Sequence, residues 1–318
     1  MPGYGRRYPE VPARIDRIRF ALEEAGYGLP ATPTDFGMAP VEAVHSPGLL
    51  HHLRTAWERS RTNCEPGEPF LPDTFAVGGR RDYIGCLLGQ AGVMAFDVSC
   101  PIFESTWQAS YNATQAAITA ADHLRTHGGT VYSLGRPPGH HAGYGYHGGF
   151  CYTNHAAAAA AHLAAYDRVV VLDIDYHHGN GTQNIFWRDD RVYTASLHAD
   201  PRVDYPYFWG HAAEQSLTNL NVPLPHGTTD DEYLRALDPV LTDIVAFGPK
   251  YLVLAAGFDL MAGDPVPRNG GFAITTPGLK RIAECIASLK LPTVIVQEGG
   301  YNLDRLGEYA VTLLDAFR

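Results

Sequence analysis

Lysines, clustered basic residues and long apolar runs are all scarce in this chain. Of its 318 residues, only Lys250, Lys280 and Lys290 are lysines, and 34 Asp and Glu outnumber 24 Lys and Arg. Without a basic cluster, a surface for a nucleic-acid backbone is not expected. No apolar run approaches the roughly 20 residues of a membrane-spanning helix, and the opening segment MPGYGRRYPEVPARIDRIRF lacks the apolar stretch of a signal peptide. These absences predict no nucleic-acid partner, no membrane association and a cytoplasmic location.

Cysteine is also rare, and its pattern excludes a disulfide framework. The five cysteines are odd in number and contain no C-x-x-C pair, which is typical of free thiols in a reducing compartment. The composition, 45% hydrophobic and 18% charged, is that of an ordinary globular protein. A chain of this length buries about three quarters of its unfolded surface, so it needs no disulfide or metal merely to fold.

Short β-branched segments alternate with longer helical patterns along the chain. Strands are expected at residues 130–134, 168–174, 192–197, 251–256 and 293–297. Helices are expected at residues 80–96, 106–126, 152–165, 230–246, 277–289 and 303–316, and the Gly/Pro-rich stretch 62–80 is expected to form one ordered surface loop. Near-continuous apolar strands separated by helices predict an α/β fold, with a mostly parallel open sheet covered by helices on both faces. We expect one domain spanning residues 1–318.

Polar, glycine-rich segments follow all five predicted strands. In chain order they read GRPPGHHAGYGYHGGF, DYHHGNGTQ, HADPRVDYPYFWGH, GFDLMAGDP and EGGYN. Open parallel sheets bind their ligands just beyond the carboxyl ends of the strands. The five segments are therefore expected to meet at one rim.

The segment D-I-D-Y-H has the spacing of a metal site. Residues two apart in an extended segment point to the same side, so Asp173, Asp175 and His177 share one face. Asp259, just past a later strand, would add a third ligand to Asp175 and His177. Two carboxylates and one imidazole suit a divalent cation such as zinc and leave a fourth position for water. The alternative for this motif alone is that its residues cap helices or line solvated loops.

Two further segments carry residues suited to proton transfer. His140 and His141 follow a rigid R-P-P-G turn, and histidine is the side chain whose pKa lies near neutrality. Asp173 and Asn180 are candidate orienting partners for the two rings. Tyr301, in E-G-G-Y-N, would donate a hydrogen bond to a developing oxyanion, although it would equally pack as an aromatic beside a glycine turn.

These motifs together resemble a known family. R-P-P-G-H-H-A, D-I-D-Y-H-H-G-N-G-T-Q, A-G-F-D-x-x-x-G-D-P and E-G-G-Y-N are similar to those of the zinc-dependent deacetylases of the arginase/deacetylase superfamily. This group includes class I and II histone deacetylases and bacterial acetylpolyamine amidohydrolases. The resemblance runs from Tyr8-Pro9-Glu10, which is similar to the family's H-P-E, to the C-terminus. It implies the arginase/deacetylase fold.

The resemblance also implies a role for each motif residue. One Zn²⁺ per chain would be held by Asp175, His177 and Asp259. His141 would be the general base and acid, His140 its neighbour bonded to Asp173, Asn180 the partner of His141, and Tyr301 the group that polarises the carbonyl. Structural K⁺ or Na⁺ ions are implied at two further sites. Their ligands would be Asp173, Asp175, His177, Ser196 and Leu197 at one site, and Phe186, Asp189 and Val192 at the other.

The expected substrate follows from departures at the rim. Ser99 stands where histone deacetylases carry the Asp of an Asp-Cys-Pro segment that grips a peptide backbone. Glu104 resembles the acidic rim residue of polyamine deacetylases, although it would equally be a helix N-terminal residue that favours the helix dipole. Gly149, Phe150 and Phe208 are expected to line the acyl-amine tunnel.

The sequence thus predicts a zinc-dependent amidohydrolase. By attack of metal-activated water, it would remove acetyl groups from acetylated polyamines or related small primary amines. Because the family's polyamine enzymes are dimers, a homodimer is expected. The alternatives are a protein lysine deacylase, a non-catalytic protein that binds acyl-amines, and an arginase-like two-metal enzyme.

Overall fold

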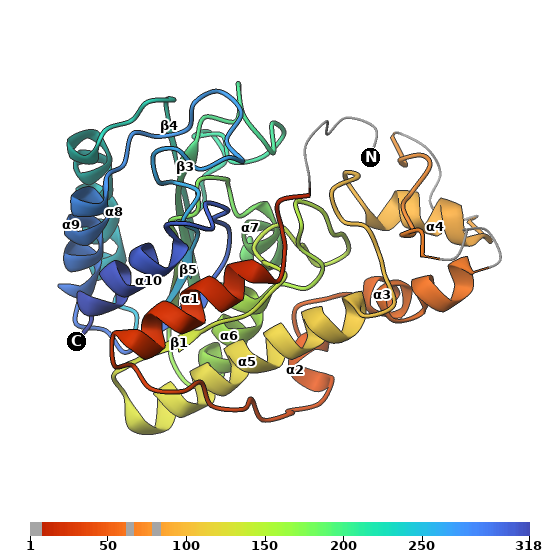
Figure 1. The fold of residues 1–318 in the computed structure, drawn as a ribbon, viewed down its shortest axis with the longest axis horizontal. Helices are drawn as coiled ribbons and strands as arrows, with labels where there is room; N and C mark the ends of the chain where they lie inside the picture. The colour runs from red at the N-terminus through yellow and green to blue at the C-terminus, as the bar shows by residue number, and fades with distance from the viewer. Residues whose placement is uncertain (1–7, 62–66, 78–83) are drawn as a thin grey trace.

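Six parallel strands form the centre of the structure, a computed structural model that describes residues 8–61, 67–77 and 84–318. The strands are ordered β1-β6-β5-β2-β3-β4, and each neighbouring pair is parallel. Helices cover the sheet on both sides (Figure 1), so the predicted fold class is confirmed. The strands are β1 (Thr130–Ser133), β2 (Val169–Asp173), β3 (Val192–Ala199), β4 (Asn219–Leu224), β5 (Tyr251–Ala256) and β6 (Thr293–Gln297).

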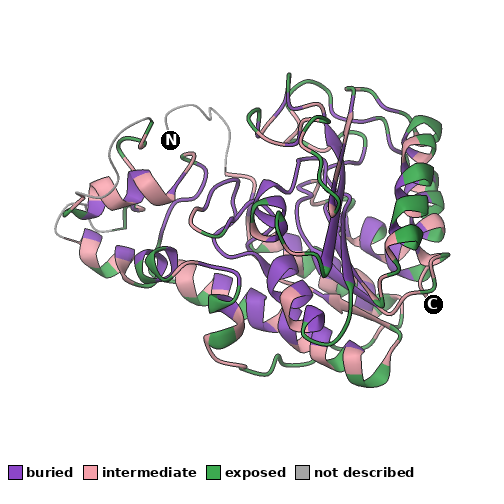
Figure 2. Cartoon of the chain, turned by 180° about the vertical axis from the view of Figure 1, so that it is seen from behind, coloured by how far each residue is buried: buried purple, intermediate pink, exposed green. Residues whose placement is uncertain are grey.

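The central strand β2 shows why the sheet is covered on both faces. All five of its residues are buried. Val169 and Val171 belong to one apolar cluster, whereas Val170 and Leu172 belong to another, because successive side chains point to opposite faces of a sheet. Figure 2 shows the sheet as an almost continuously buried layer.

Two long helices cover the first face. These helices, α5 (Thr106–His127) and α6 (His155–Ala164), contribute to the cluster that holds Val169 and Val171. Residues 156–160 of α6 are all alanines with 0% exposure, so the helix backbone packs close to the strands. Asn154 caps α6 by accepting a hydrogen bond from the backbone N–H of Ala157 at 2.8 Å.

The second face is covered by four helices. Helix α8 begins with a capping box between Thr229 and Glu232 and ends at the left-handed Gly248. Side chains from all four helices pack against Val170 and Leu172 in one apolar cluster. The helices are α1 (Ala13–Glu24), α8 (Asp230–Phe247), α9 (Thr276–Ala287) and α10 (Leu306–Asp315).

The remaining elements were missed or misplaced by the sequence analysis. Strand β4 escaped notice because NLNVPL mixes polar residues and a proline into an edge strand, with only half of its residues buried. Helix α4 (Leu87–Met94) is shorter than the predicted 80–96, of which residues 80–83 lie outside the described residues. Residues 62–66 and 78–80 of the predicted surface loop also lie outside them. The other unpredicted helices are α1, α2 (Ala39–Glu42), α3 (Pro47–Ser60) and α7 (Asn180–Phe186).

Candidate active site

The polar segments after the strands meet at one edge of the sheet, as expected for a parallel arrangement. Side chains from the β1, β2 and β5 segments are joined by direct hydrogen bonds, described below. The segment after β6 joins them through the backbone N–H of Gly299, which donates to Asp175 Oδ2 at 2.8 Å. The rim predicted from the sequence is therefore a real cluster of side chains.

Three buried side chains form a candidate metal site. His177 Nδ1 lies 2.9 Å from Asp259 Oδ2 and 3.4 Å from Asp175 Oδ1. One donor atom from each residue lies within 4.8 Å of the others. Asp175 and Asp259 are each 1% exposed.

The electrostatics of these three residues fit a divalent cation. Burial, followed by the charge of Asp175, raises the pKa of Asp259, which shows that two buried carboxylates repel each other here. Burial alone would lower the pKa of His177, but its hydrogen bonds to the carboxylates and their charges raise it well above its usual value. A buried set of two carboxylates and one imidazole offers hard and borderline donors and a charge that a divalent metal would balance.

Glycine makes this packing possible on the β6 side. A Cβ atom on Gly299 would lie 2.6 Å from Asp175 Oδ2 and 2.8 Å from Asp259 Oδ2. Any side chain at position 299 would therefore displace the two carboxylates. This contact explains the first of the two glycines that precede Tyr301.

The tandem histidines lie beside this site with different hydrogen-bond partners. His140 Nδ1 lies 2.9 Å from Asp173 Oδ2, and His141 Nδ1 lies 2.7 Å from Asn180 Oδ1. Burial opposes a charge on His140, but the charges of Asp175 and Asp173 outweigh it and raise the pKa of His140 to about 10. Burial, with the charges of His140 and His177, lowers the pKa of His141 well below its usual value. Asp175 and Asp173 thus favour a proton on His140, whereas the surroundings of His141 favour its neutral form.

Asn180 fixes the orientation of the neutral ring. Its side-chain oxygen accepts from Nδ1–H of His141, which leaves Nε2 of His141 as a free acceptor. Asn180 is the first residue of α7, and its backbone carbonyl accepts from the hydroxyl of Tyr146 at 3.1 Å. The His141 ring is thus held by a group that is itself anchored to the fold.

Tyr301 is buried and held on three sides. Its backbone N–H donates to Asp264 Oδ2 at 2.6 Å. The Arg14 guanidinium lies 4.6 Å from the centroid of its ring, and the Phe150 ring centroid lies 5.7 Å away. Burial raises the pKa of Tyr301 well above its usual value, against the opposing charge of Arg14. The phenol therefore keeps its proton and is available as a hydrogen-bond donor.

Arg14 and Glu10 support the segment that leads to Tyr301, and neither was predicted from the sequence to have a functional role. Arg14 is 0% exposed and donates to the backbone carbonyls of Gly300 at 2.6 Å and Glu298 at 2.5 Å. Glu10 pairs with Arg14 at 3.2 Å and also with Arg136. A signal did exist, because Arg14 stands in the apolar stripe of α1, four residues before the buried Ile18.

Residues 149–150 bring the rim loop against the histidine pair. Gly149 and Phe150 both have left-handed φ values, 58° and 68°, and a Cβ atom on Gly149 would collide with the His141 ring. The backbone N–H of Gly149 donates to Asp97 Oδ2 at 2.9 Å, and the Tyr205 hydroxyl donates to the same oxygen at 2.8 Å. The Tyr205 ring centroid lies 5.1 Å from that of His141. Asp97 and Tyr205 are thus rim residues that the sequence analysis missed.

Two predicted rim residues are not brought against the histidine pair. Phe208 is 79% exposed and packs edge-on to Trp209, at a ring-centroid distance of 6.1 Å. Glu104 is exposed in the turn that leads into α5. Phe150 is 8% exposed and lies beside Tyr301, so it alone of the two predicted aromatic walls is next to the site. The roles of Glu104 and Phe208 stay predictions.

The residues predicted for monovalent cations lie on β2, β3 and α7 or in the segments just after β2 and α7. Asp173 and Ser196 are partners in the parallel register of β2 and β3. Leu197, Phe186 and Val192 are buried. The Asp189 carboxylate is paired with the Arg191 side chain at 2.8 Å, so it is its carbonyl that would be free for an ion. Both cation sites stay predictions.

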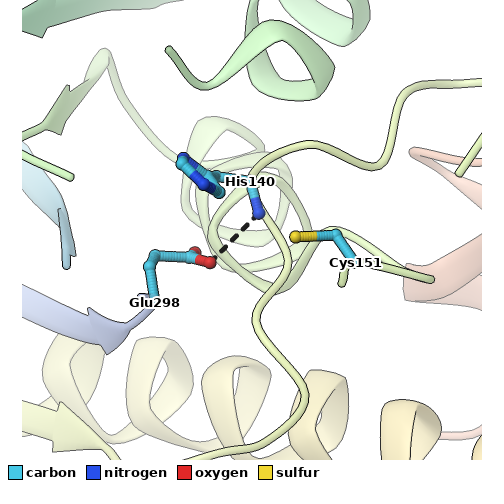
Figure 3. Close-up of side chains that lie close together, drawn as sticks. All are labelled: His140, Cys151 and Glu298. Atoms are coloured by element: carbon cyan, nitrogen blue, oxygen red, sulfur yellow. Dashed lines mark hydrogen bonds between the residues drawn. The ribbon is translucent and has the colours of Figure 1, made fainter. Parts of the chain in front are cut away.

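A second group of three side chains with metal-ligating atoms includes His140. Among the residues that the structure describes, His140, Cys151 and Glu298 also have donor atoms within 4.8 Å of one another. However, the Glu298 carboxylate already accepts from the backbone N–H of His140 (Figure 3), and His140 Nδ1 is bonded to Asp173. These bonds do not favour an arginase-like two-metal centre.

Two other expectations concern the whole chain. Cys86, Cys100, Cys151 and Cys285 are free thiols, and Cys64 lies outside the described residues. Of the helices in the described ranges, none combines the length and the apolar character needed to cross a membrane.

Metal-dependent hydrolases combine metal ligands with a nearby proton acceptor and a donor for the oxyanion, and this rim carries all three. The comparisons with known proteins give the family. Residues 8–317 match the family described as "Histone deacetylase domain", and the chain belongs to that family. The family implies a metal, usually zinc, and the predicted family is confirmed.

Several relatives that match over nearly the whole chain carry a more specific name. The chain is 39% identical to acetylpolyamine amidohydrolase 1 of Pseudomonas aeruginosa, over 97% of this chain and 91% of the relative. It is 38% identical to an acetylpolyamine amidohydrolase of Burkholderia pseudomallei, over 99% of this chain and 93% of that one. A crystal structure of an acetylpolyamine aminohydrolase from Burkholderia pseudomallei superposes with a TM-score of 0.93 at 38% identity, covering 100% of this chain and 93% of that chain.

Proposed function

We propose that this protein is a zinc-dependent amidohydrolase that removes acetyl groups from acetylated polyamines or similar small primary amines. The observation that carries the proposal is the contrast within the histidine pair. A neutral His141, held by Asn180 at 2.7 Å, stands beside a buried set of two carboxylates and one imidazole. A non-catalytic acyl-amine binder would have no need of this arrangement.

The residues present fit one divalent ion per chain, with Asp175, His177 and Asp259 as its ligands. Zinc bound there would polarise the amide carbonyl and lower the pKa of a water molecule. His141 accepts the proton of the attacking water at Nε2. The Tyr301 hydroxyl donates a hydrogen bond to the carbonyl oxygen as it gains negative charge.

The same groups complete the reaction. The carboxylates of Asp175 and Asp173 favour a positive charge on His140, which would stabilise the negative charge that builds up next to it. The proton taken by His141 then passes to the amine nitrogen as the C–N bond breaks. The products are acetate and a free primary amine.

The substrate class rests on the rim. Ser99 bonds with its hydroxyl to Asp97 at 2.7 Å, and Asp97 also accepts from Gly149 and Tyr205. The nearest carboxylate at this part of the rim is therefore occupied by the protein's own donors rather than free to hold a peptide backbone. The names of the relatives support the same choice.

A substrate panel tests this proposal. We expect N-acetylputrescine, N-acetylcadaverine and acetylspermidine to have higher kcat/KM values than an acetyl-lysine peptide. A peptide that is hydrolysed faster than all three would favour the protein lysine deacylase. Absence of hydrolysis for every amide, with metal bound, would favour the non-catalytic binder.

The remaining expectations form part of the same proposal. Val203, Tyr207 and Phe208 lie on the loop after β3 and are 54%, 43% and 79% exposed. These exposed apolar side chains support a homodimer in which the partner subunit covers the tunnel mouth. Light scattering would measure the oligomeric state. The proposal also includes structural K⁺ or Na⁺ ions, one domain over residues 1–318 and a cytoplasmic location. The free thiols support the reducing compartment.

A further inference from the structure

Glu298 connects the end of β6 to the turn that carries the histidine pair. It is 0% exposed, and its Oε2 atom accepts from the backbone N–H of Gly139 at 2.6 Å. The same atom accepts from the backbone N–H of His140 at 3.1 Å, as Figure 3 shows. Both donors are buried. Without Glu298 they would lie in the interior with no partner, which is a costly condition for backbone N–H groups.

The other side of the same turn is held by α7. The His140 carbonyl accepts from the backbone N–H of Gly181 at 3.0 Å and of Thr182 at 3.2 Å. The turn is thus clamped between the first residues of α7 and the Glu298 carboxylate. Glu298 supplies the contact that fixes it relative to β6.

Strand β6 leads directly to Tyr301, three residues beyond Glu298. The main chain between them is itself immobilised, since Arg14 donates to the carbonyls of Glu298 and Gly300. The side chain of Glu298 holds the turn that carries the histidine pair, and its backbone leads to the oxyanion donor Tyr301. Glu298 therefore links the turn of the histidine pair directly to the segment that carries Tyr301.

We propose that Glu298 is a positioning residue that holds His140 and His141 at a fixed distance from Tyr301. The inference rests on the proposed function, which assigns those three residues to the reaction. It requires only an acceptor at the position of Oε2. The second oxygen, Oε1, is buried and has no hydrogen-bond partner among the residues that the structure describes, so the positioning role leaves it unused.

This requirement gives a matched set of variants. Glu298→Gln keeps a carbonyl oxygen for the two N–H groups, whereas Glu298→Met has similar length and only a weak acceptor. We expect the Gln variant to keep kcat within about threefold of the wild type, and the Met variant to lose about 10- to 100-fold in kcat, since small misplacements of reacting groups cost this much. The KM of both should stay within about threefold, because no substrate contact is removed. Metal content and melting temperature are measured on each.

Two readouts do not depend on turnover. The downfield proton resonances of Nδ1–H in His140 and His141 should be retained in Glu298→Gln and be shifted or broadened in Glu298→Met. In the wild type, hydrogen exchange should show the Gly139 and His140 amides to be protected. Rapid exchange of these two amides would overturn the proposal even if the Met variant does not fold.

The kinetic outcomes are equally decisive. A folded, metal-loaded Met variant with wild-type kcat would show that the clamp is not needed. A Gln variant as impaired as the Met variant would show that the charge of Glu298 matters rather than its acceptor oxygen. The wild type could hydrolyse no amide while the Nδ1–H resonances of His140 and His141 still change in Glu298→Met and not in Glu298→Gln. In that case the proposed function fails and the positioning role of Glu298 stands.

Discussion

His140 and His141 are neighbours in the chain and in space, with ring centroids 4.0 Å apart, yet one bonds to a carboxylate and the other to an amide. Asp175 and Asp173 raise the pKa of His140, whereas burial, followed by the charge of His140, lowers the pKa of His141. Asn180 orients His141 without adding a negative charge of its own. Environments that push two pKa values apart assign one ring to accept a proton and the other to stay charged.

Replacing Asn180 with aspartate tests this division. A carboxylate 2.7 Å from Nδ1 would stabilise the charged form of His141 and raise its pKa. A general base with a raised pKa is protonated over a wider acidic range, so activity would be lost at a higher pH as the pH falls. We expect the acidic limb of the kcat/KM profile to move up by about 1–2 pH units.

The control for this change is Asn184→Asp, an exposed position on the same helix, whose side chain accepts from the backbone N–H of Tyr144 rather than from His141. Its profile should match the wild type. Coinciding acidic limbs for wild type and Asn180→Asp would contradict the role of His141 as the base.

The metal ligands can be tested by content as well as by activity. Asp259→Ala and His177→Ala should each lose bound metal and activity together, because two remaining ligands hold zinc poorly in an open site. Elemental analysis of the purified proteins is the measurement, with the exposed Asp304→Ala as control. Stoichiometric zinc in either folded ligand variant would remove that residue from the site.

Tyr301→Phe separates the oxyanion donor from packing. The ring keeps its contacts with Arg14 and Phe150, so fold and metal content should be unchanged. The loss of one oxyanion donor should lower kcat about 10²- to 10³-fold. Steady-state kinetics check this, and a kcat within a few-fold of the wild type would make Tyr301 a packing residue.

The sequence predicted the residues of this site better than it predicted their supports. Asp175, His177 and the histidine pair lie on short segments just after strands, where a period of two and a parallel sheet dictate both side and edge. Arg14 supports Tyr301 through its bond to the carbonyl of Gly300, which is 286 residues away in the sequence. Such a pairing depends on how α1 packs against α10, beside the segment that follows β6, and the local sequence pattern contains no information on it.

The rim shows the same limit. Tyr205 reaches Asp97 across 108 residues, from a loop whose sequence, D-Y-P-Y-F-W, offers several aromatics of equal promise. In the structure Tyr205, which the sequence analysis did not single out, lies beside His141. Which of the aromatics turns inward is decided by the Asp97 carboxylate that accepts from its hydroxyl, and this contact exists only in the folded chain.

Two buried histidines outside the site predict how the protein responds to acid. The rings of His52 and His147 are stacked with centroids 6.0 Å apart. No ring nitrogen of either has a hydrogen-bond partner among the described residues. Burial, followed by the charge of Arg59, lowers the pKa of His52 to about 4, and burial, followed by the charge of His52, lowers the pKa of His147 to about 3.

The sign of the effect follows from proton uptake. Above about pH 6.5 neither the folded nor the unfolded chain protonates these rings, whereas between about pH 6.5 and 4 only the unfolded chain does. The free energy of unfolding should therefore fall as the pH falls through this window, by about 1.4 kcal/mol per pH unit for each histidine.

His147→Phe keeps an aromatic ring beside Tyr152, 5.7 Å away, and removes one such contribution. Urea unfolding at pH 7 and pH 5 should show a smaller loss of stability in His147→Phe than in the wild type, whereas the exposed His127→Phe should lose as much as the wild type. Equal losses in wild type and His147→Phe would mean that His147 takes up its proton in the folded state.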